Sequence, residues 1–169
     1  MDPEKSGYFY WLAGSPRKAL ANFRKAYETK TSITAAFALV LMADELGDTA
    51  QRDAVIDELC TRHRDKAPKS IRILQMLRDS LFRDVPRAPD LNAVDQIIEG
   101  STPEARGNMA FLVGWCLRGH GKPEDARAYL ERCTHAPNTL NWFRIIAADA
   151  LRVPGGDREP AKVNPRTSS

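Results

Sequence analysis

Apolar residues recur every three to four positions along most of the chain, which is the period of an amphipathic α-helix. The segments 32–46 and 70–82 show this period most clearly, and further helices are predicted over 91–98, 102–119 and 140–151. No segment sustains the period of two that a half-buried β-strand requires. The pattern therefore predicts an all-α protein without a sheet.

Proline and glycine mark where these helices begin and end. A side chain that can cap a helix precedes proline at 2–3, 15–16 and 102–103, a pairing typical of helix starts. Two prolines within 81–90 interrupt the helical pattern and predict a linker. The segment 153–169 is rich in proline, glycine and polar residues, and we expect it to be a disordered tail.

A set of small and bulky residues recurs with the same internal spacing near the two ends of the chain. The two copies are Gly7, Gly14, Ala19, Phe23 and Ala26, and Gly114, Gly121, Ala126, Leu130 and Cys133. Glycine and alanine where two helices cross allow a close approach, and the bulky residue fills the gap beside them. The spacing therefore predicts paired antiparallel helices that repeat along the chain.

Two more copies are less regular. Val40 and Gly47 repeat the first spacing, whereas Ala54 comes two residues late, so that either the loop carries an insertion or Ala54 is the wrong match. The remaining gap fits one degenerate unit. We therefore expect a repeat domain over 1–152, with units at about 1–31, 32–67, 68–101 and 102–137 and a terminal helix over 138–152.

The repeated residues resemble the tetratricopeptide repeat (TPR) superfamily, whose unit carries a Leu-Gly-x-x-Tyr signature and a later Ala-x-x-x-Phe. The resemblance rests on Gly7 with Tyr10, Gly114 with Leu117, and the later Ala19-x-x-x-Phe23 and Ala126-x-x-x-Leu130. The tryptophan that often opens the motif is missing, with Ala36 and Ala110 in its place. The resemblance implies a right-handed α-solenoid of stacked helix pairs whose first helices line a concave groove.

Composition and charge exclude several classes of protein. Hydrophobic residues make up 43% and charged residues 28% of 169 residues, which is typical of a folded soluble domain. No apolar run reaches the length of a membrane span, which is about 20 residues. Three cysteines are too few and odd in number for a disulfide framework, so we expect a reducing, cytoplasmic setting. The formal net charge of +3 is too small to indicate nucleic acid by itself.

Residues with possible chemistry do not form a catalytic or metal-binding motif in the sequence. Neither a phosphate-binding loop nor a nucleophile elbow is present, and we expect no enzyme and no cofactor. Each cysteine has a histidine two to four residues later, at Cys60, Cys116 and Cys133. We predict that these thiols are buried and structural and that they form no metal site. Zinc binding and a labile disulfide between Cys116 and Cys133 are the alternatives.

The groove implied by the solenoid predicts the most specific binding site. Two stripes of residues would face it, one from each of two first helices: Thr34, Phe37, Leu41 and Asp44, and Asn108, Phe111, Trp115 and Arg118. Large apolar residues flanked by polar ones suit an extended or helical peptide. The alternative is that Phe111 and Trp115 belong to the core. A clamp for two carboxylates would need lysine and asparagine here, and only Asn108 is present.

A cluster of basic residues surrounds the predicted turn between the second and third units. Its members are Arg62, Arg64, Lys66, Lys69 and Arg72. A solvated turn is the simplest interpretation, and an acidic protein or RNA are the alternatives. No aromatic residue interleaves the cluster, so base stacking is unsupported and nucleic acid is disfavoured.

Four consecutive aromatic residues lie on the predicted first helix, at Tyr8, Phe9, Tyr10 and Trp11, and Trp142 lies on the last. They spread around more than half of the first helix, so we expect an interface with a second copy or with another domain. The function predicted from the whole sequence is a non-enzymatic scaffold or adaptor that binds a partner peptide. An RNA-binding module using residues 62–72, or an interaction segment of a larger chain with an enzyme domain, are the alternatives.

Overall fold

The computed structural model describes the chain except for residues 1, 31, 138–140 and 153–169, and every regular element of the described part is an α-helix. The all-α prediction is confirmed for these residues. The predicted tail over 153–169 lies outside them. The helices are α1 (Pro3–Leu12), α2 (Pro16–Lys30), α3 (Ile33–Glu45), α4 (Thr49–Arg62), α5 (Pro68–Ser80), α6 (Leu91–Glu99), α7 (Pro103–Gly119), α8 (Pro123–His135) and α9 (Asn141–Arg152).

Side-chain caps explain why several helices begin where they do. The Asp2 carboxylate accepts a hydrogen bond of 2.9 Å from the backbone N–H of Glu4, and the Ser32 hydroxyl accepts one of 3.2 Å from that of Ala35. Asp48 and Asp90 cap α4 and α6 in the same way. Each cap satisfies an N–H that has no partner inside the helix.

Three turns between paired helices have the same backbone conformation. Gly14, Gly47 and Gly121 have φ angles of 66°, 70° and 71°, a left-handed conformation that favours glycine. They lie between α1 and α2, α3 and α4, and α7 and α8, as the repeat predicts. The third pair differs, because α5 is followed by the mostly exposed segment 81–90 instead of a glycine turn.

The predicted close approach of paired helices is confirmed at two glycines. A Cβ atom placed on Gly7 would lie 2.6 Å from Cε1 of Phe23, well inside the van der Waals limit. One placed on Gly114 would lie 3.0 Å from Cγ of Leu130 and 3.1 Å from the carbonyl oxygen of Ala126. In both pairs the bulky residue of the second helix therefore packs directly over the glycine of the first.

Of the two alternatives for the second helix pair, the burial pattern favours a wrong match of Ala54 over an insertion in the loop. Ala54 is exposed, whereas Arg52 is 4% exposed and lies five residues after Gly47. That is the spacing of Ala19 from Gly14 and of Ala126 from Gly121. An arginine therefore replaces alanine at the helix crossing of this unit.

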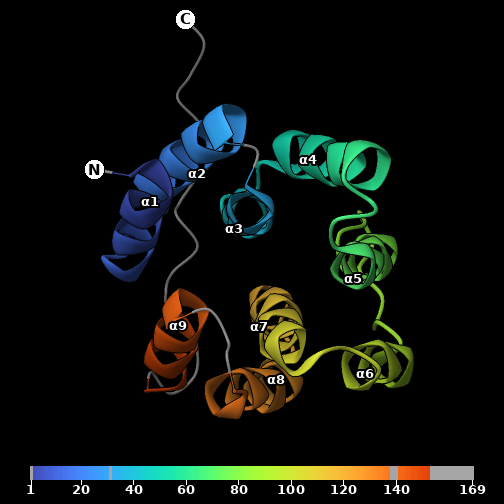
Figure 1. Ribbon diagram of the computed structural model, residues 1–169. Helices are drawn as coiled ribbons and strands as arrows, with labels where there is room; N and C mark the ends of the chain where they lie inside the picture. Colours follow the sequence, from blue (N-terminus) through green and yellow to red (C-terminus); the bar gives the residue numbers. More distant parts are fainter. Residues whose placement is uncertain (1, 31, 138–140, 153–169) are drawn as a thin grey trace, which may run out of the picture.

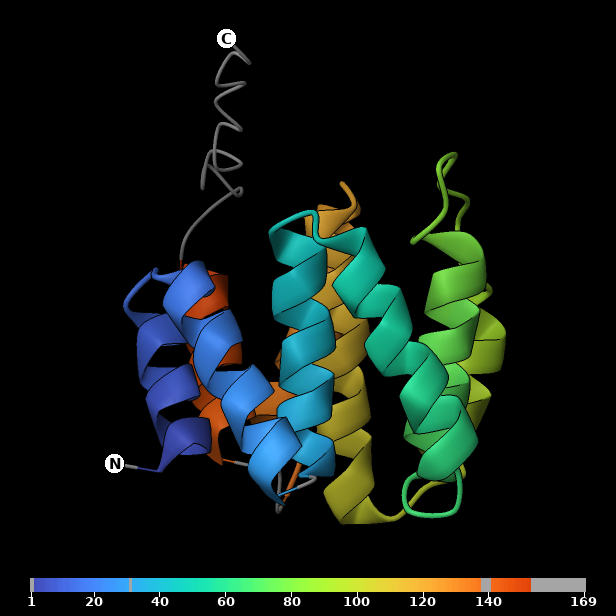
Figure 2. The same ribbon diagram turned by 90° about the horizontal axis from the view of Figure 1, so that it is seen from above.

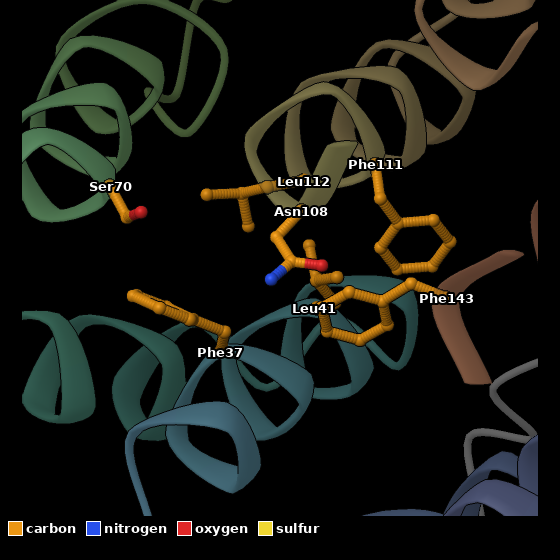
Figure 3. Close-up of a pocket in the computed structure, with 7 residues that line it drawn as sticks. All are labelled: Phe37, Leu41, Ser70, Asn108, Phe111, Leu112 and Phe143. Carbon is orange, nitrogen blue, oxygen red and sulfur yellow. The ribbon is translucent and has the colours of Figure 1, made fainter. Parts of the chain in front are cut away.

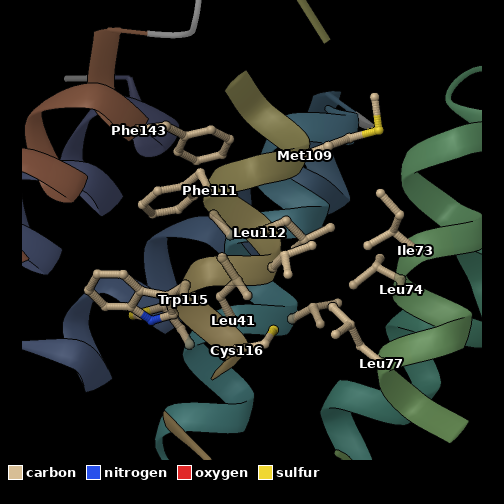
Figure 4. Packing of buried hydrophobic residues seen from close by; sticks show 14 of the residues in the cluster. Leu41, Ile73, Leu74, Leu77, Met109, Phe111, Leu112, Trp115, Cys116 and Phe143 are labelled. Carbon is tan, nitrogen blue, oxygen red and sulfur yellow. The ribbon is translucent and has the colours of Figure 1, made fainter. Parts of the chain in front are cut away.

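Helices α3 and α7 lie at the centre of the bundle and the other helices surround them (Figure 1; Figure 2). The two central helices contact each other, and α1 contacts α9, although both contacts join units that are not neighbours in the sequence. In an open stack each unit contacts only its neighbours. The sequence pattern did not predict these closing contacts. As a result every residue from 109 to 117 on α7 is buried, and the core centres on this helix (Figure 4).

Candidate functional site

Four of the eight residues predicted to line a peptide groove come together between α3 and α7. Phe37, Leu41, Asn108 and Phe111 point toward one small cavity, which Ser70, Leu112 and Phe143 complete (Figure 3). Its volume is about 10 Å³. A single buried water needs about 10–15 Å³, so the cavity has room for one water and not for a peptide. The predicted groove is filled by its own side chains.

Phe111 and Trp115 belong to the core, and their assignment to an open concave face was wrong. The Phe111 ring stacks on that of Phe143, with centroids 4.4 Å apart, and the Trp115 ring meets Trp11 edge to face at 4.9 Å. Their exposed fractions are 0% and 8%. The physical reason is that the rings of Phe143 on α9 and Trp11 on α1 pack against this side of α7.

The other residues of the predicted stripes are placed around this core. Leu41 is buried, and Thr34, Phe37 and Asn108 are half-buried. The Arg118 guanidinium lies 5.2 Å from the centre of the Trp115 ring, within the range of a cation–π interaction.

Asp44 takes part in a polar network inside the bundle instead of facing a ligand. One carboxylate oxygen accepts a hydrogen bond of 2.8 Å from Arg52, and the other lies 2.9 Å from Nε2 of His120. Arg52 also donates to Asp53 at 2.9 Å and to the carbonyl oxygen of Phe82 at 3.1 Å. The network therefore joins α3, α4 and α7 with the end of α5.

Arg52 stays charged in this setting. Burial by itself lowers the pKa of its guanidinium, but the hydrogen bonds to Asp53 and Asp44 outweigh burial and raise it. Its guanidinium carbon lies 4.3 Å from the centre of the Phe82 ring, so an aromatic face covers the charge. This network was not predicted from the sequence. The signal that could have revealed it is an arginine at the repeat position where the other pairs have alanine.

Two of the three cysteines, Cys116 and Cys133, are buried, and Cys60 is half-buried. All three cysteines are free. Burial raises the pKa of Cys116 well above its usual range and that of Cys133 to about 12, so both thiols stay protonated near neutral pH. A protonated thiol is a poor nucleophile and a poor metal ligand. Within the described residues, no group of three His, Cys, Asp or Glu side chains is placed to hold a metal ion.

The basic cluster lies on the surface at the turn after α4 and at the start of α5. Arg62, Arg64, Lys66, Lys69 and Arg72 are all exposed. Arg62 pairs with Glu58 at 3.3 Å, and Lys69 donates to the carbonyl oxygen of Gly100. Two of the five basic side chains, Arg62 and Lys69, thus have partners within the protein.

The aromatic run on α1 divides between the core and the surface. Tyr8 and Trp11 are each 2% exposed, whereas Phe9 is 55% and Tyr10 37% exposed. Placing all four at an interface was therefore wrong for Tyr8 and Trp11. Trp142 of α9 covers Tyr8 with its ring parallel at 5.4 Å and meets Phe9 edge to face at 5.2 Å. The hydroxyl of Tyr8 and the indole nitrogen of Trp11 are buried without a hydrogen-bond partner.

Most of the large apolar side chains that stay exposed in the described residues lie on two neighbouring helices. They are Phe9, Tyr10 and Ile145, and only Val85 lies elsewhere, in the segment 81–90. Trp142 is half-buried on α9 and contacts Phe9. We call Phe9, Tyr10, Trp142 and Ile145 the α1–α9 patch.

A shallow surface hollow adjoins this patch on α9. Thr134 of α8 and Arg144, Ile145 and Ala148 of α9 line it, and its volume is about 360 Å³. The hollow and the patch share Ile145, so they adjoin each other on α9.

Comparison of the chain with protein-family models, with curated proteins and with solved structures gave no match. Among the described helices, none has both the length and the apolar character needed to cross a membrane.

Proposed function

We propose that the protein is a non-enzymatic interaction module, a scaffold or adaptor built from TPR-like helix pairs, and that it binds another protein through the α1–α9 patch. The equal turns at Gly14, Gly47 and Gly121 and the close crossings at Gly7 and Gly114 support the repeat assignment. The filled space between α3 and α7 favours a binding face on the outside of the bundle over the concave groove.

The observation that carries this proposal is the position of the exposed apolar residues. Three of the four large ones in the described residues lie on α1 and α9, which contact each other. A contiguous exposed apolar surface on a folded protein marks an interaction site more often than chance. Aromatic residues are enriched among those that contribute most to protein binding. Phe9 and Trp142 pack edge to face across α1 and α9, and Tyr10 follows Phe9 on α1 with its ring next to Lys18 of α2.

The proposal is tested by comparing retained proteins between matched variants. The immobilised chain, its Phe9→Ser/Tyr10→Ser variant and its Val85→Ser variant are incubated with cell extract, and bound proteins are quantified by mass spectrometry. Phe9 and Tyr10 are exposed, so the double variant keeps its fold, which a melting curve verifies. We expect a specific partner to be retained about tenfold less by the double variant and equally well by Val85→Ser. Equal retention by all three proteins would contradict the patch assignment.

A further inference from the structure

Helix α9 has the position and spacing of the first helix of a fifth unit. Ala148 follows Gly114 by 34 residues, close to the interval of 33 residues between Gly7 and Val40. Helix α9 packs on α8 and α7, just as α3 packs on α2. Ala148 therefore corresponds to Gly7 and Gly114, the small residues over which a second helix packs in the first and fourth units.

The hollow lies where the second helix of that fifth unit would pack. It is lined by Ala148 and its neighbours Arg144 and Ile145 on α9, and by Thr134 at the end of α8. Ile145 is 49% exposed. No helix of the described chain covers this face of α9, whereas α2 and α8 cover the matching faces of α1 and α7.

The complete pairs show which residues such a helix needs. In α2 the bulky Phe23 lies over the glycine, with Ala19 one turn before it and Ala26 one turn after it. In α8 the corresponding residues are Leu130, Ala126 and Cys133. A helix that fits the hollow therefore has a bulky apolar residue flanked by two small ones, at spacings of four and three residues.

Charge adds a second requirement. Arg144 lines the hollow and Arg152 follows Ala148 by one helical turn, and both are exposed. Within the described chain neither arginine forms an ion pair with a carboxylate. A second copy packing α9 against α9 would bring like charges together, which disfavours a symmetric dimer here. Acidic residues on the incoming helix would instead be attracted.

We propose that the hollow binds an acidic amphipathic α-helix of a partner protein, which completes the fifth unit in trans. The required pattern is a small residue, a bulky apolar residue four positions later and a second small residue three positions after that. This inference rests on the proposed function and names the kind of partner segment that the module recognises. The recognition is of the helix-in-groove type.

Two peptides from the chain itself serve as probes, because both carry the apolar pattern but differ in charge. Residues 123–135 of α8 contain three acidic residues and two arginines, whereas residues 16–30 of α2 contain one acidic and five basic residues. Fluorescein-labelled peptides are titrated with the full chain and followed by fluorescence anisotropy. We expect the α8 peptide to bind at least about fivefold more tightly than the α2 peptide, because two exposed cations flank the site. Equal affinities would contradict the charge requirement.

Variants of the full chain then locate the site. Ala148→Trp fills the hollow, and we expect it to weaken binding of the α8 peptide about tenfold. Arg144→Glu reverses an exposed charge without affecting the core, and we expect a loss of about threefold. Arg83→Glu, an equally exposed arginine in the segment 81–90, is the matched control and should bind as the wild-type chain does.

Each outcome either supports or overturns the proposal. If both Arg144→Glu and a correctly folded Ala148→Trp variant bind the α8 peptide as tightly as the wild-type chain, the peptide binds elsewhere. A chain ending at Arg152 that binds the α8 peptide more than about tenfold more tightly than the full chain would assign the hollow to residues 153–169, and would also overturn binding in trans. The Phe9→Ser/Tyr10→Ser variant should bind the α8 peptide normally, so failure of this inference is distinguishable from failure of the proposed function.

Discussion

The carboxylate of Asp44 lies 2.9 Å from Nε2 of His120, although 76 residues separate them in the sequence. Asp44 belongs to the last turn of α3 and His120 caps the end of α7, so this contact joins the two central helices. The other oxygen of Asp44 binds Arg52 of α4. The Asp44 carboxylate thus connects α3 to α4 and to the end of α7.

Removing this carboxylate should destabilise the protein strongly. Asp44→Ala leaves the Arg52 side chain, which is 5% exposed, without the more buried of its two carboxylate partners, and we expect the free energy of unfolding to fall by about 3 kcal/mol. Asp53→Ala is the control: its carboxylate is 45% exposed, and its loss should cost less than about 1 kcal/mol. Urea unfolding of both variants measures the difference. Adding Arg52→Met to Asp44→Ala should recover most of the loss, and no recovery would show that the charge is not the cause.

Two glycines of α7 should respond to alanine in opposite directions. At Gly114 a Cβ atom would lie 3.1 Å from a backbone oxygen of α8, so Gly114→Ala should lower stability by about 1–3 kcal/mol. At Gly119 the nearest atom to such a Cβ is 3.9 Å away, so Gly119→Ala should be neutral or stabilise the helix by up to about 1 kcal/mol. Thermal unfolding followed by circular dichroism tests the pair. Equal effects would mean that α7 and α8 do not cross closely at Gly114.

Removing the buried Trp115 ring should destabilise the protein far more than removing the exposed Phe9 ring. Trp115→Ala removes a ring that packs against Trp11 and Phe111, and we expect a loss of about 3–5 kcal/mol of stability. Phe9→Ala removes a side chain that is 55% exposed, so stability should change by less than about 1 kcal/mol. Chemical unfolding of each variant provides the test. A stable Trp115→Ala protein would place Trp115 on an accessible surface after all.

Stability should decline at alkaline pH, in part because of Cys133. Burial raises the pKa of this thiol from 9.0 to about 12, so the folded state keeps a proton that the unfolded state releases. The contribution of the protonated Cys133 thiol to stability is complete below pH 9, falls between pH 9 and about 12, and is lost above that. Cys133→Ala should reduce the slope of the unfolding free energy against pH by roughly 1.4 kcal/mol per pH unit, which is the slope that one proton contributes. Urea unfolding from pH 8 to 10.5 measures the slope, and identical slopes would contradict the burial of the thiol.

Features set by neighbouring residues were predictable from the sequence. The helices follow from the apolar period and the caps, and the turns at Gly14, Gly47 and Gly121 follow from the spacing of three glycines. The close crossings at Gly7 and Gly114 follow from a small residue on one helix and a bulky one on its partner. All of these depend on residues within about one repeat of each other.

Features set by contacts between distant units could not be predicted in this way. Whether Phe111 faces solvent or Phe143 depends on which side of α7 the following helix α9 covers, and the apolar period of α7 by itself does not give that side. The same holds for Trp11 and Trp115, which belong to the first and fourth units. Arg52 was not predicted because the first and fourth helix pairs have alanine at this position, and the alanine matched to it in the second pair, the exposed Ala54, comes two residues late.

The closing contacts also limit how this protein can change in length. An open array of repeats tolerates duplication or loss of an internal unit, because each unit interacts only with its neighbours. Here α3 contacts α7 and α1 contacts α9, so an extra unit between the second and the fourth would separate α3 from α7 and remove the Asp44–His120 contact. The number of helices between α3 and α7 is therefore constrained by the interior of the bundle, whereas a further helix packed on α9 at the hollow would leave the α3–α7 contact intact.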